Sequence, residues 1–583
     1  MKKKWLIYDV DNEEEIVSLK NKMGIDKITA QMLWRRGVQS LEEAHQFFNP
    51  KLEHLHSPFL MKDMDSAVNR LVQAIDEQQK VIIYGDYDVD GTTSVAMMYS
   101  YLKNHITNLS YYIPDRYDEG YGLSEKAINF ATENEVDLII TLDCGIRAVE
   151  NIALGKKNGI DFIVCDHHTP GEVLPDAIVL DPKRKDCNYP YKELCGCGVG
   201  FKLLSALVDK KGLSKEKLYD YLDFVSIAIG ADIVPITGEN RTLCSVGLEK
   251  LNSNPRLGIA KLLELAKRPV PLTLTDVVFV IAPRINAAGR MLHAKEAVEL
   301  LITRDHNYAT ELAEKIQGAN SDRKTTDEEV KNEALAMLNS DPQHKSRCTN
   351  VVFGKGWHKG VIGIVASRII EEYYRPTVVF SQPEEGELLT ASARSAGNVN
   401  IYDVLNNCAE LFEKFGGHAH AAGLSIKEEN YEAFKTKFDD EVRKVIEEET
   451  LIPQEIIECE IRFNEIFRPG DAMNGEPNLK KMLNRFEPHG PGNMKPVFVS
   501  KNVYITDFRV LKEVHLKFSF KQTDSDVRID AICFNRPDLI NLAQKGATVQ
   551  IAYTIETNEW KNQKRIQLNI KDMRPENVVE YAN

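Results

Sequence analysis

Long apolar runs are missing from this sequence. No continuous apolar stretch approaches the roughly 18 residues that a membrane-spanning helix needs, so no such helix is expected. The N-terminus, MKKKWLIYDVDNEEE, carries basic residues as a signal peptide does, but its apolar stretch is too short and acidic residues follow at once. We therefore expect a cytoplasmic protein that makes no contact with a membrane.

Closely paired cysteines are missing as well. The ten cysteines are scattered, and no two of them have the C-x-x-C spacing of a zinc ribbon; CGC at 195–197 has a single intervening residue. Buried thiols in a reducing compartment are the expected state. In particular, Cys165 directly precedes an acidic motif, but it is expected to belong to the core and not to act as a nucleophile.

Positive charge is in deficit. The chain has 73 Lys and Arg residues against 87 Asp and Glu residues, a net charge of −14. This balance argues against broad adhesion to DNA or to an anionic membrane, but it leaves room for a nucleic-acid substrate held in a local basic groove. Solenoid repeats and low-complexity tracts are absent too, and a monomer is expected.

What is present suggests three or four domains with sizeable cores, because the chain has 583 residues of which 43% are hydrophobic. Apolar strands predicted at 80–85, 136–143, 161–166 and 177–182 alternate with helices, among them 64–79, 92–104 and 147–159. Continuous apolar strands that alternate with helices predict a parallel α/β sheet.

The remaining chain divides by pattern. Residues 200–230 are expected to be helical, 230–241 to be a loop, and 294–340 to form one or two long helices, whereas short strands at regular spacing over 455–578 predict a small β-barrel. The expected domains are a helical lead-in (1–55), an α/β domain (56–290), connecting helices (291–345), a second α/β unit (346–450) and the barrel (451–583).

An acidic turn follows the first predicted strand. In VIIYGDYDVDGTTS, Asp86, Asp88 and Asp90 place three like charges within five residues. A calcium loop would need a Glu at its twelfth position, where this chain has Met97, and it would follow a helix, not a strand. A solvated turn and a divalent-metal site remain as alternatives.

Two further strand ends favour the metal site. Asp143 in TLDCG ends the next clear strand, and Asp166, His167 and His168 in CDHH end the one after. In a parallel sheet these ends lie along one edge, so carboxylates and imidazoles converge there and need cations. Such donors suit manganese, or magnesium with some waters. Asp232 in GADIVP could close the set.

The motifs DYDVDG, DCG, DHH and GADIVP, in this order, resemble the four motifs of the DHH phosphoesterase superfamily. The resemblance continues through GCGVGFKLL (196–204), APRINAAGRM (282–291), GWHKGVIGIVASR (356–368), ASARS (391–395), FGGHAHAAG (415–423) and EPHGPGNMKPVF (487–498). Together they are similar to the bacterial RecJ family of single-strand-specific 5′→3′ DNA exonucleases. The resemblance implies a DHH domain, a DHH-associated domain and a C-terminal OB-fold.

The resemblance also implies two divalent metal ions that clamp one phosphate, Mn²⁺ first and Mg²⁺ as the alternative. The implied ligands are Asp88 for one ion, Asp90 for the other, Asp143 as the bridge, and His167 and Asp232 to complete the coordination of the second ion. His168 would polarise the phosphate or transfer a proton, and Asp86 would orient a ligand or assist the nucleophile. One departure is Tyr84, which stands where related pyrophosphatases have a metal-binding His.

Further residues are expected to hold the nucleic acid. They are His418 as a catalytic phosphate contact, and the phosphate-binding candidates Arg116, Arg284, Arg290, Ser392, Arg394, Gly416 and Gly417. Arg394 lies between two hydroxyls in SARS, and a guanidinium pairs bidentately with phosphate oxygens. In the barrel, Phe518, Phe520, Arg528, Phe534 and Tyr553 could contact unpaired bases, although the core is the safer place for any one of them.

The implied function is hydrolysis of single-stranded DNA from its 5′ end to 5′-mononucleotides, in repair and recombination. By analogy only, single-strand-binding protein and a recombination helicase are expected partners. Two alternatives stay open: a small-substrate DHH phosphoesterase, and an inactive relative that serves as a scaffold. The candidate ligands are all present, which disfavours the scaffold; the barrel disfavours the small-substrate enzyme, and length and Tyr84 disfavour a pyrophosphatase.

Overall fold

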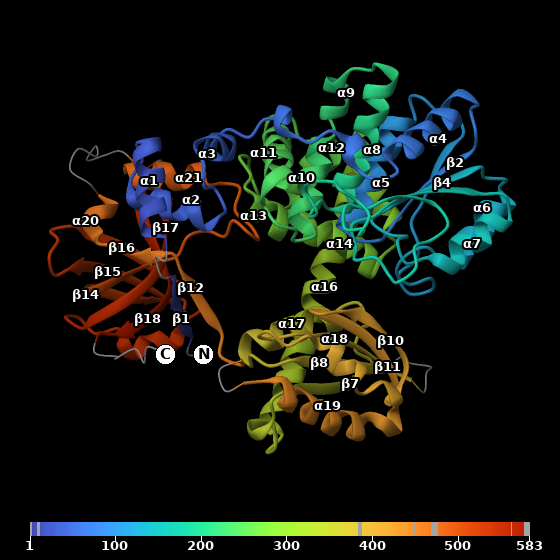
Figure 1. Ribbon diagram of the computed structural model, residues 1–583. Helices are drawn as coiled ribbons and strands as arrows, with labels where there is room; N and C mark the ends of the chain where they lie inside the picture. The colour runs from blue at the N-terminus through green and yellow to red at the C-terminus, as the bar shows by residue number, and fades with distance from the viewer. Residues whose placement is uncertain are drawn as a thin grey trace. The chain divides into compact units, whose positions relative to one another are not determined.

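The computed structural model describes residues 3–8, 12–382, 388–447, 450–467, 476–560 and 563–576 (Figure 1). The chain forms two compact units: His45–Lys324 together with Glu487–Met494, and Met1–Ala44 together with Thr325–Phe486 and Lys495–Asn583. None of the described helices is long and apolar enough to cross a membrane. All ten cysteines are free thiols, and all except Cys348 are buried.

The first unit is built on a five-stranded sheet. Its order is β3 (Leu109–Tyr112), β2 (Val81–Gly85), β4 (Leu138–Leu142), β5 (Asp161–Cys165) and β6 (Ile178–Leu180), and every neighbouring pair is parallel. The parallel α/β prediction is therefore confirmed. Strand β3 escaped prediction because LSYY is short and only half-buried, without the continuous apolar run of the central strands.

Alternate residues of the central strands pack on opposite faces of this sheet. Ile83 belongs to the larger core, which α4 (Met64–Asp76), α5 (Val89–Leu102) and α8 (Gly196–Lys211) share. Ile82 faces the other side, which α6 (Glu125–Glu133) and α7 (Val149–Lys157) cover (Figure 1). Burial on both faces explains why these strands are apolar throughout.

Helices complete the first unit. They are α9 (Lys215–Tyr219), α10 (Leu222–Ala231), α11 (Gly238–Ser253), α12 (Leu257–Leu265), α13 (Leu274–Asp276), α14 (Ala282–Met291) and α15 (Lys295–Ile302). The expected loop 230–241 is shorter than predicted, because α10 runs on to Ala231 and α11 already begins at Gly238. The expected long connecting helix is α16 (His306–Ser340), 35 residues in length.

The second α/β domain has a mixed sheet in the order β10 (Phe412–His418), β11 (Ala421–Lys427), β9 (Leu388–Arg394), β8 (Thr377–Gln382) and β7 (Asn350–Lys355). Strands β7 and β8 are parallel, and the other pairs are antiparallel. Helix α17 (Ile362–Glu372) packs on one face, and α18 (Ile401–Asn406) and α19 (Tyr431–Val445) pack on the other.

The C-terminal strands close into a barrel, as predicted. Strands β14 (Phe498–Leu511), β15 (His515–Gln522), β16 (Arg528–Cys533), β18 (Gln563–Pro575) and β17 (Thr548–Trp560) are neighbours in this order, and β14 also pairs with β17. Phe518, Phe520 and Tyr553 are buried in the barrel core, whereas Phe534 is 52% exposed. The first three therefore pack inside and do not face a ligand.

The N-terminal segment differs from the purely helical lead-in that we expected. It begins with β1 (Lys4–Ile7), which pairs in parallel with β12 (Gln454–Ile457), before α1 (Glu13–Met23), α2 (Lys27–Arg35) and α3 (Leu41–Phe48). Trp5 is buried and donates from Nε1 to Asp572 of β18 at 2.8 Å. Four residues are too few to show strand periodicity, so only the distant pairing partner reveals this strand.

Candidate metal centre and phosphate-binding residues

The acidic motifs follow strands that lie at the switch point of the first sheet. Strand β2 connects to β3 on one side, and the chain then continues at β4 on the other side. Ligands of open α/β sheets bind at the carboxyl ends of the strands beside such a point. The DYDVDG turn follows β2, Asp143 follows β4, and CDHH follows β5. Asp181, which follows β6, also lies on this edge; our sequence analysis predicted its strand but passed over its carboxylate.

Asp90 is held by backbone amides from a distant helix. It lies in the first turn of α5, and its carboxylate accepts hydrogen bonds from Gly196 N at 2.7 Å and Cys197 N at 2.8 Å, at the start of α8. A β-carbon at Gly196 would come within 2.5 Å of the Asp143 β-carbon. The glycine of the GCG motif thus lets α8 approach two carboxylates at once.

Four of the predicted ligands come together, with three carboxylates around His167. Its Nε2 lies 3.1 Å from Asp143 Oδ1, 3.6 Å from Asp232 Oδ2 and 3.9 Å from Asp90 Oδ2. Two overlapping groups, Asp90 with His167 and Asp232, and Asp143 with His167 and His168, have donor atoms within 4.8 Å of one another. Asp88 belongs to neither group; its Oδ1 caps α5 by accepting a hydrogen bond from Gly91 N at 3.0 Å.

The electrostatics of this cluster fit divalent cations. Burial, and then the negative charge of Asp88, raise the pKa of Asp90 to about 7, and burial together with neighbouring carboxylates raises the pKa values of Asp143 and Asp232 well above normal. Burial lowers the pKa of His167 to about 3, so its imidazole is neutral and able to ligate. Buried carboxylates with a neutral imidazole are the donors that Mn²⁺ and Mg²⁺ accept.

Asp166 positions His168, a role that our sequence analysis missed. Asp166 Oδ1 accepts hydrogen bonds from the amides of His167 and His168 and lies 2.7 Å from His168 Nδ1, while Oδ2 accepts from Ile146 N. Burial lowers the pKa of His168, but the hydrogen bond and charge of Asp166 outweigh it and raise that pKa to about 9. The signal in the sequence was the Asp of CDHH, which directly precedes the two histidines.

The loop between β3 and α6 also reaches the centre. Tyr121 Oη lies 3.0 Å from His168 Nε2 and donates to the Asp143 carbonyl at 3.2 Å. Both ring nitrogens of His168 therefore have partners, Asp166 and Tyr121, which favours the predicted polarising role over ligation. In the same loop, the Arg116 guanidinium stacks over the Tyr87 ring, 4.5 Å from its centre. Nothing in the motif spacing indicated Tyr121.

Three other residues that the sequence predicted for the site, Asp86, Arg284 and Arg290, have defined contacts. Asp86 is fully buried with Oδ1 bonded to Tyr87 N, and its Oδ2 has no hydrogen-bond partner among the described residues. Arg284 is buried and donates to Gln317 Oε1 and the Val280 carbonyl, so its guanidinium is largely committed to packing, whereas Arg290 accepts a hydrogen bond from Tyr117 Oη at its carbonyl.

Tyr84 does not substitute for a ligand. Its ring is buried on the face of the sheet that α6 and α7 cover, where it stacks on Tyr112 at 5.7 Å and its hydroxyl donates to the Gly122 carbonyl at 2.7 Å. The side chain is therefore a core element that supports the loop after β3. At this position, where related pyrophosphatases were expected to have a metal-binding His, the present chain has a core residue.

The phosphate-binding candidates of the second α/β domain form a group of their own. Arg394 Nη1 donates to Ser392 Oγ at 2.9 Å, and strand pairing aligns Ser392 with Gly423 and Gly423 with Gly416. A β-carbon at Gly363 would lie 2.6 Å from the Arg394 guanidinium, so the first turn of α17 closes this group. His418 ends β10, one residue after Gly417, and Ala421 of β11 pairs with both His418 and Arg394. Gly363 was not predicted.

Comparison with known families identifies the class first. The DHH family N-terminal domain matches residues 80–229, the DHHA1 domain matches 346–444, and the RecJ OB domain matches 471–572. Together with the acidic cluster at the switch point, they define a DHH-family phosphoesterase fold joined to an OB domain.

Relatives along the whole chain narrow the class. The chain is 35% identical to the single-stranded-DNA-specific exonuclease RecJ of Bacillus subtilis over 575 residues, covering 98% of this chain and 71% of the relative, and 33% identical to RecJ of Haemophilus influenzae, covering 93% and 95%. The chain belongs to the RecJ family of single-stranded-DNA-specific exonucleases.

Solved structures agree with this membership. RecJ of Thermus thermophilus in complex with Mn²⁺ matches with a TM-score of 0.83 and 26% identity, over 99% of this chain and 80% of that one. A second structure, an exonuclease RecJ bound to manganese, matches with a TM-score of 0.59 and 32% identity over 68% of this chain and 99% of that one.

Proposed function

We propose that this protein is a divalent-metal-dependent exonuclease that degrades single-stranded DNA from the 5′ end and releases 5′-mononucleotides. The observation that carries the proposal is the cluster of Asp90, Asp143, His167 and Asp232 in a chain that belongs to the RecJ family. Relatives at 30–35% identity carry the name of this activity over more than nine-tenths of the present chain.

Two ions are the proposed cofactors, with Mn²⁺ first and Mg²⁺ as the alternative, because solved relatives are in complex with manganese and, in one structure, with magnesium. Asp90, His167 and Asp232 would hold one ion, Asp143 would lie between the two, and Asp88 would contribute to the other. Bound divalent cations at such a site lower the pKa of water and neutralise developing charge on a phosphate.

The protein's own groups would then orient the reaction. His168, kept positively charged by Asp166, would stabilise negative charge on the scissile phosphate electrostatically, since both of its ring nitrogens already have partners. Asp86, which is buried with one carboxylate oxygen unengaged among the described residues, would orient a ligand or assist the nucleophile. Attack would be in line, with no covalent enzyme intermediate, since each described cysteine near the centre is buried and its pKa is raised by burial.

A second phosphate-binding group would explain the polarity. In the DHHA1 domain, Ser392, Arg394 and the first turn of α17 present hydroxyl, guanidinium and backbone donors together. We propose that this group, with Gly416, Gly417 and His418 on the neighbouring strands, binds a phosphate of the substrate, the terminal 5′-phosphate in the first instance. Arg116 and Arg290 of the other unit are the next candidates.

The compartment, the protein partners, the oligomeric state and the domain borders are proposed on more general grounds. A DNA substrate and free, buried cysteines suit the cytoplasm. Single-strand-binding protein and a recombination helicase remain proposed partners, and a monomer the proposed state. The domain borders at 55/56, 290/291, 345/346 and 450/451 likewise remain proposals.

One oligonucleotide assay tests the proposal. Strands labelled at the 3′ end, single-stranded or duplex and with a 5′-phosphate or 5′-hydroxyl, are incubated with manganese, magnesium or a chelator. We expect metal-dependent shortening of the single strand from its 5′ end, faster with the 5′-phosphate, while the duplex is spared and the chelator stops the reaction. Turnover of di- to pentanucleotides without cleavage of long strands would overturn the polymer assignment.

A further inference from the structure

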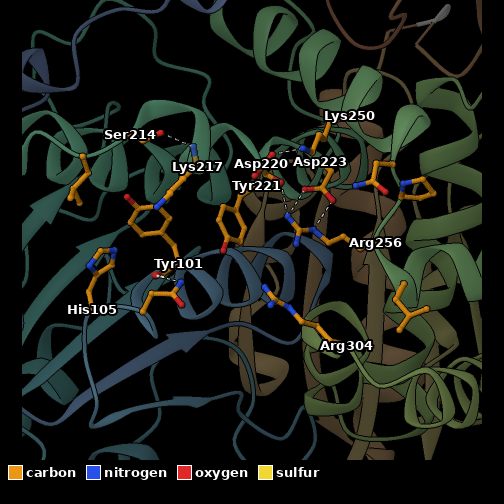
Figure 2. A pocket seen from close by; sticks show the side chains of 15 residues that line it. Tyr101, His105, Ser214, Lys217, Asp220, Tyr221, Asp223, Lys250, Arg256 and Arg304 are labelled. Atoms are coloured by element: carbon orange, nitrogen blue, oxygen red, sulfur yellow. Dashed lines mark hydrogen bonds and ion pairs between the residues drawn. The ribbon is translucent and has the colours of Figure 1, made fainter.

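The first unit contains a second concave site, separate from the acidic centre (Figure 2). It has a volume of about 830 Å³, within the range of roughly 300–1,000 Å³ that is usual for small-molecule sites. Its walls come from the C-terminal end of α5, from α9, from the start of α12 and from the segment between α15 and α16.

Two cations in this site lack an acidic partner. Arg256 pairs with Asp223 at 2.6 Å, and Lys250 pairs with Asp220. In contrast, among the residues that the structure describes, neither the Lys217 ammonium nor the Arg304 guanidinium takes part in an ion pair, and both side chains are exposed. Figure 2 shows Lys217 and Arg304 entering from opposite sides with Tyr221 between them.

Backbone donors add to this positive character. Helix α12 starts at the pocket, and its N-cap residue, Arg256, makes no side-chain cap hydrogen bond; its first turn contains no acidic residue. The N-terminal amides of a helix and its dipole favour an anion. The unpaired Lys217 and Arg304 match the charge of about −1.5 to −2 that a phosphate monoester carries near pH 7.

Aromatic rings line the same site. The ring of Tyr101 lies 5.5 Å from that of His105 and 5.9 Å from that of Tyr221, between centroids, and all three residues border the pocket. Tyr221 is fixed by a hydrogen bond from its hydroxyl to the Ser100 carbonyl at 3.1 Å. Fixed aromatic rings beside unpaired cations are what a ligand with both a base and a phosphate requires.

We propose that this pocket binds a nucleoside monophosphate, with the phosphate attracted by the positive charge of Lys217 and Arg304 and the base against His105 and Tyr221. The site is distinct from the acidic centre: α5 begins at the acidic turn and ends at the pocket, and the 11 residues from Asp90 to Tyr101 span about 16 Å at 1.5 Å per residue. The proposal does not depend on the exonuclease activity, because binding is measured without cleavage.

Calorimetric titration of the full-length protein with dAMP, in a chelator, tests the proposal. We expect one binding event that Arg304→Glu and Lys217→Glu each weaken about tenfold or more, since each removes a charge-assisted contact and adds repulsion. Inorganic phosphate and deoxyadenosine alone should each bind more weakly than dAMP. Both substituted side chains are exposed, and circular dichroism checks that the variants are folded.

Two control variants distinguish binding in this pocket from binding at the acidic centre or at the surface. Lys210→Glu, an exposed lysine of α8 that does not line the pocket, should bind dAMP like the wild type, and so should Asp143→Asn at the acidic centre. The proposal is overturned if dAMP does not bind, if the pocket variants bind it normally, if Asp143→Asn abolishes binding, or if inorganic phosphate binds as tightly as dAMP.

Discussion

The carboxylates of the acidic centre lower the stability of the folded protein when no metal ion is bound. Asp90 and Asp143 are buried and Asp232 is partly exposed beside them, and burial together with the charge of neighbouring carboxylates raises the pKa values of all three. Folding therefore opposes their ionisation, and the charged cluster destabilises the fold at neutral pH. A ligand that neutralises the cluster should stabilise the folded state by mass action.

The substitution Asp143→Asn tests this balance. We expect it to reduce cleavage more than about a hundredfold, the upper range for loss of a supporting group at a metal site. We also expect it to raise the melting temperature in chelator, because one buried like charge is removed. Wild-type protein should melt at a higher temperature with Mn²⁺ than in chelator, and the variant should show a smaller rise. Cleavage assays and thermal melts measure these effects.

Asp176→Asn is a matched control, because this carboxylate is exposed and pairs only with Lys156 among the described residues. It should leave cleavage and both melting temperatures near those of the wild type. If Asp143→Asn cleaved at the wild-type rate, Asp143 would have no place between the ions.

Elements of the first unit are joined by a buried polar network. Lys202 of α8 donates to Glu239 Oε1 at 2.6 Å and to the His56 carbonyl at 3.0 Å. Glu239 of α11 also accepts from Tyr189 Oη at 2.7 Å and from His56 N at 2.8 Å. Lys202 and Glu239 are 1% and 3% exposed, so water cannot replace a lost partner. The network links α8, which also holds Asp90, to α11 and to the segment near residue 56.

We expect Glu239→Gln to destabilise the first unit by about 3–5 kcal/mol, because it leaves the Lys202 ammonium buried without its counter-charge. A fall in melting temperature measures this effect. Adding Lys202→Met to Glu239→Gln should recover much of the loss, since no uncompensated charge then remains. Asp76→Asn, which breaks the exposed pair with Lys211, should change stability by less than about 1 kcal/mol. An unchanged melting temperature of Glu239→Gln would show that the network contributes little.

On the scale of the whole molecule, the barrel is the domain that distinguishes an enzyme for long strands from an enzyme for dinucleotides, because it can contact additional unpaired bases. Closure of the barrel puts Phe518, Phe520 and Tyr553 in its core, so they stabilise the domain. Phe534, which contacts His515 edge-on at 5.4 Å, stays exposed next to β16. Among these four aromatic residues it is therefore the best placed for stacking on an unpaired base.

We expect Phe534→Ala to weaken binding of long single-stranded DNA about fivefold or more, since stacking on one base is worth about 1–3 kcal/mol. Cleavage of a dinucleotide should be unchanged, because hydrolysis at the acidic centre does not itself require stacking on the barrel. Fluorescence anisotropy and product analysis measure the two effects. Ile540→Ala, another exposed apolar residue of the same domain, is the control and should alter neither. Equal losses on long and short substrates would contradict a role in polymer binding.

The fold class was predictable from the sequence because its signals are local. Apolar strands such as 81–85 and 138–142 need no partner to be recognised, and turn residues bound the barrel strands. The exceptions were elements that depend on distant partners: β1 exists because β12 lies beside it, and β3 is too short and polar to stand out. The start of α11 at Gly238 was likewise not predicted, because residues 230–241 have the composition of a loop.

The sequence by itself determined which strand ends carry acid, and parallel topology then requires those ends to meet; the grouping of Asp90, Asp143, His167 and Asp232 follows from that rule. Only the tertiary structure decided that α8 amides hold Asp90, that Asp166 and Tyr121 position His168, and that Lys217 and Arg304 face one pocket. The reason is physical: strand polarity is set within a few residues, whereas hydrogen bonds and cavities arise between segments far apart in the chain.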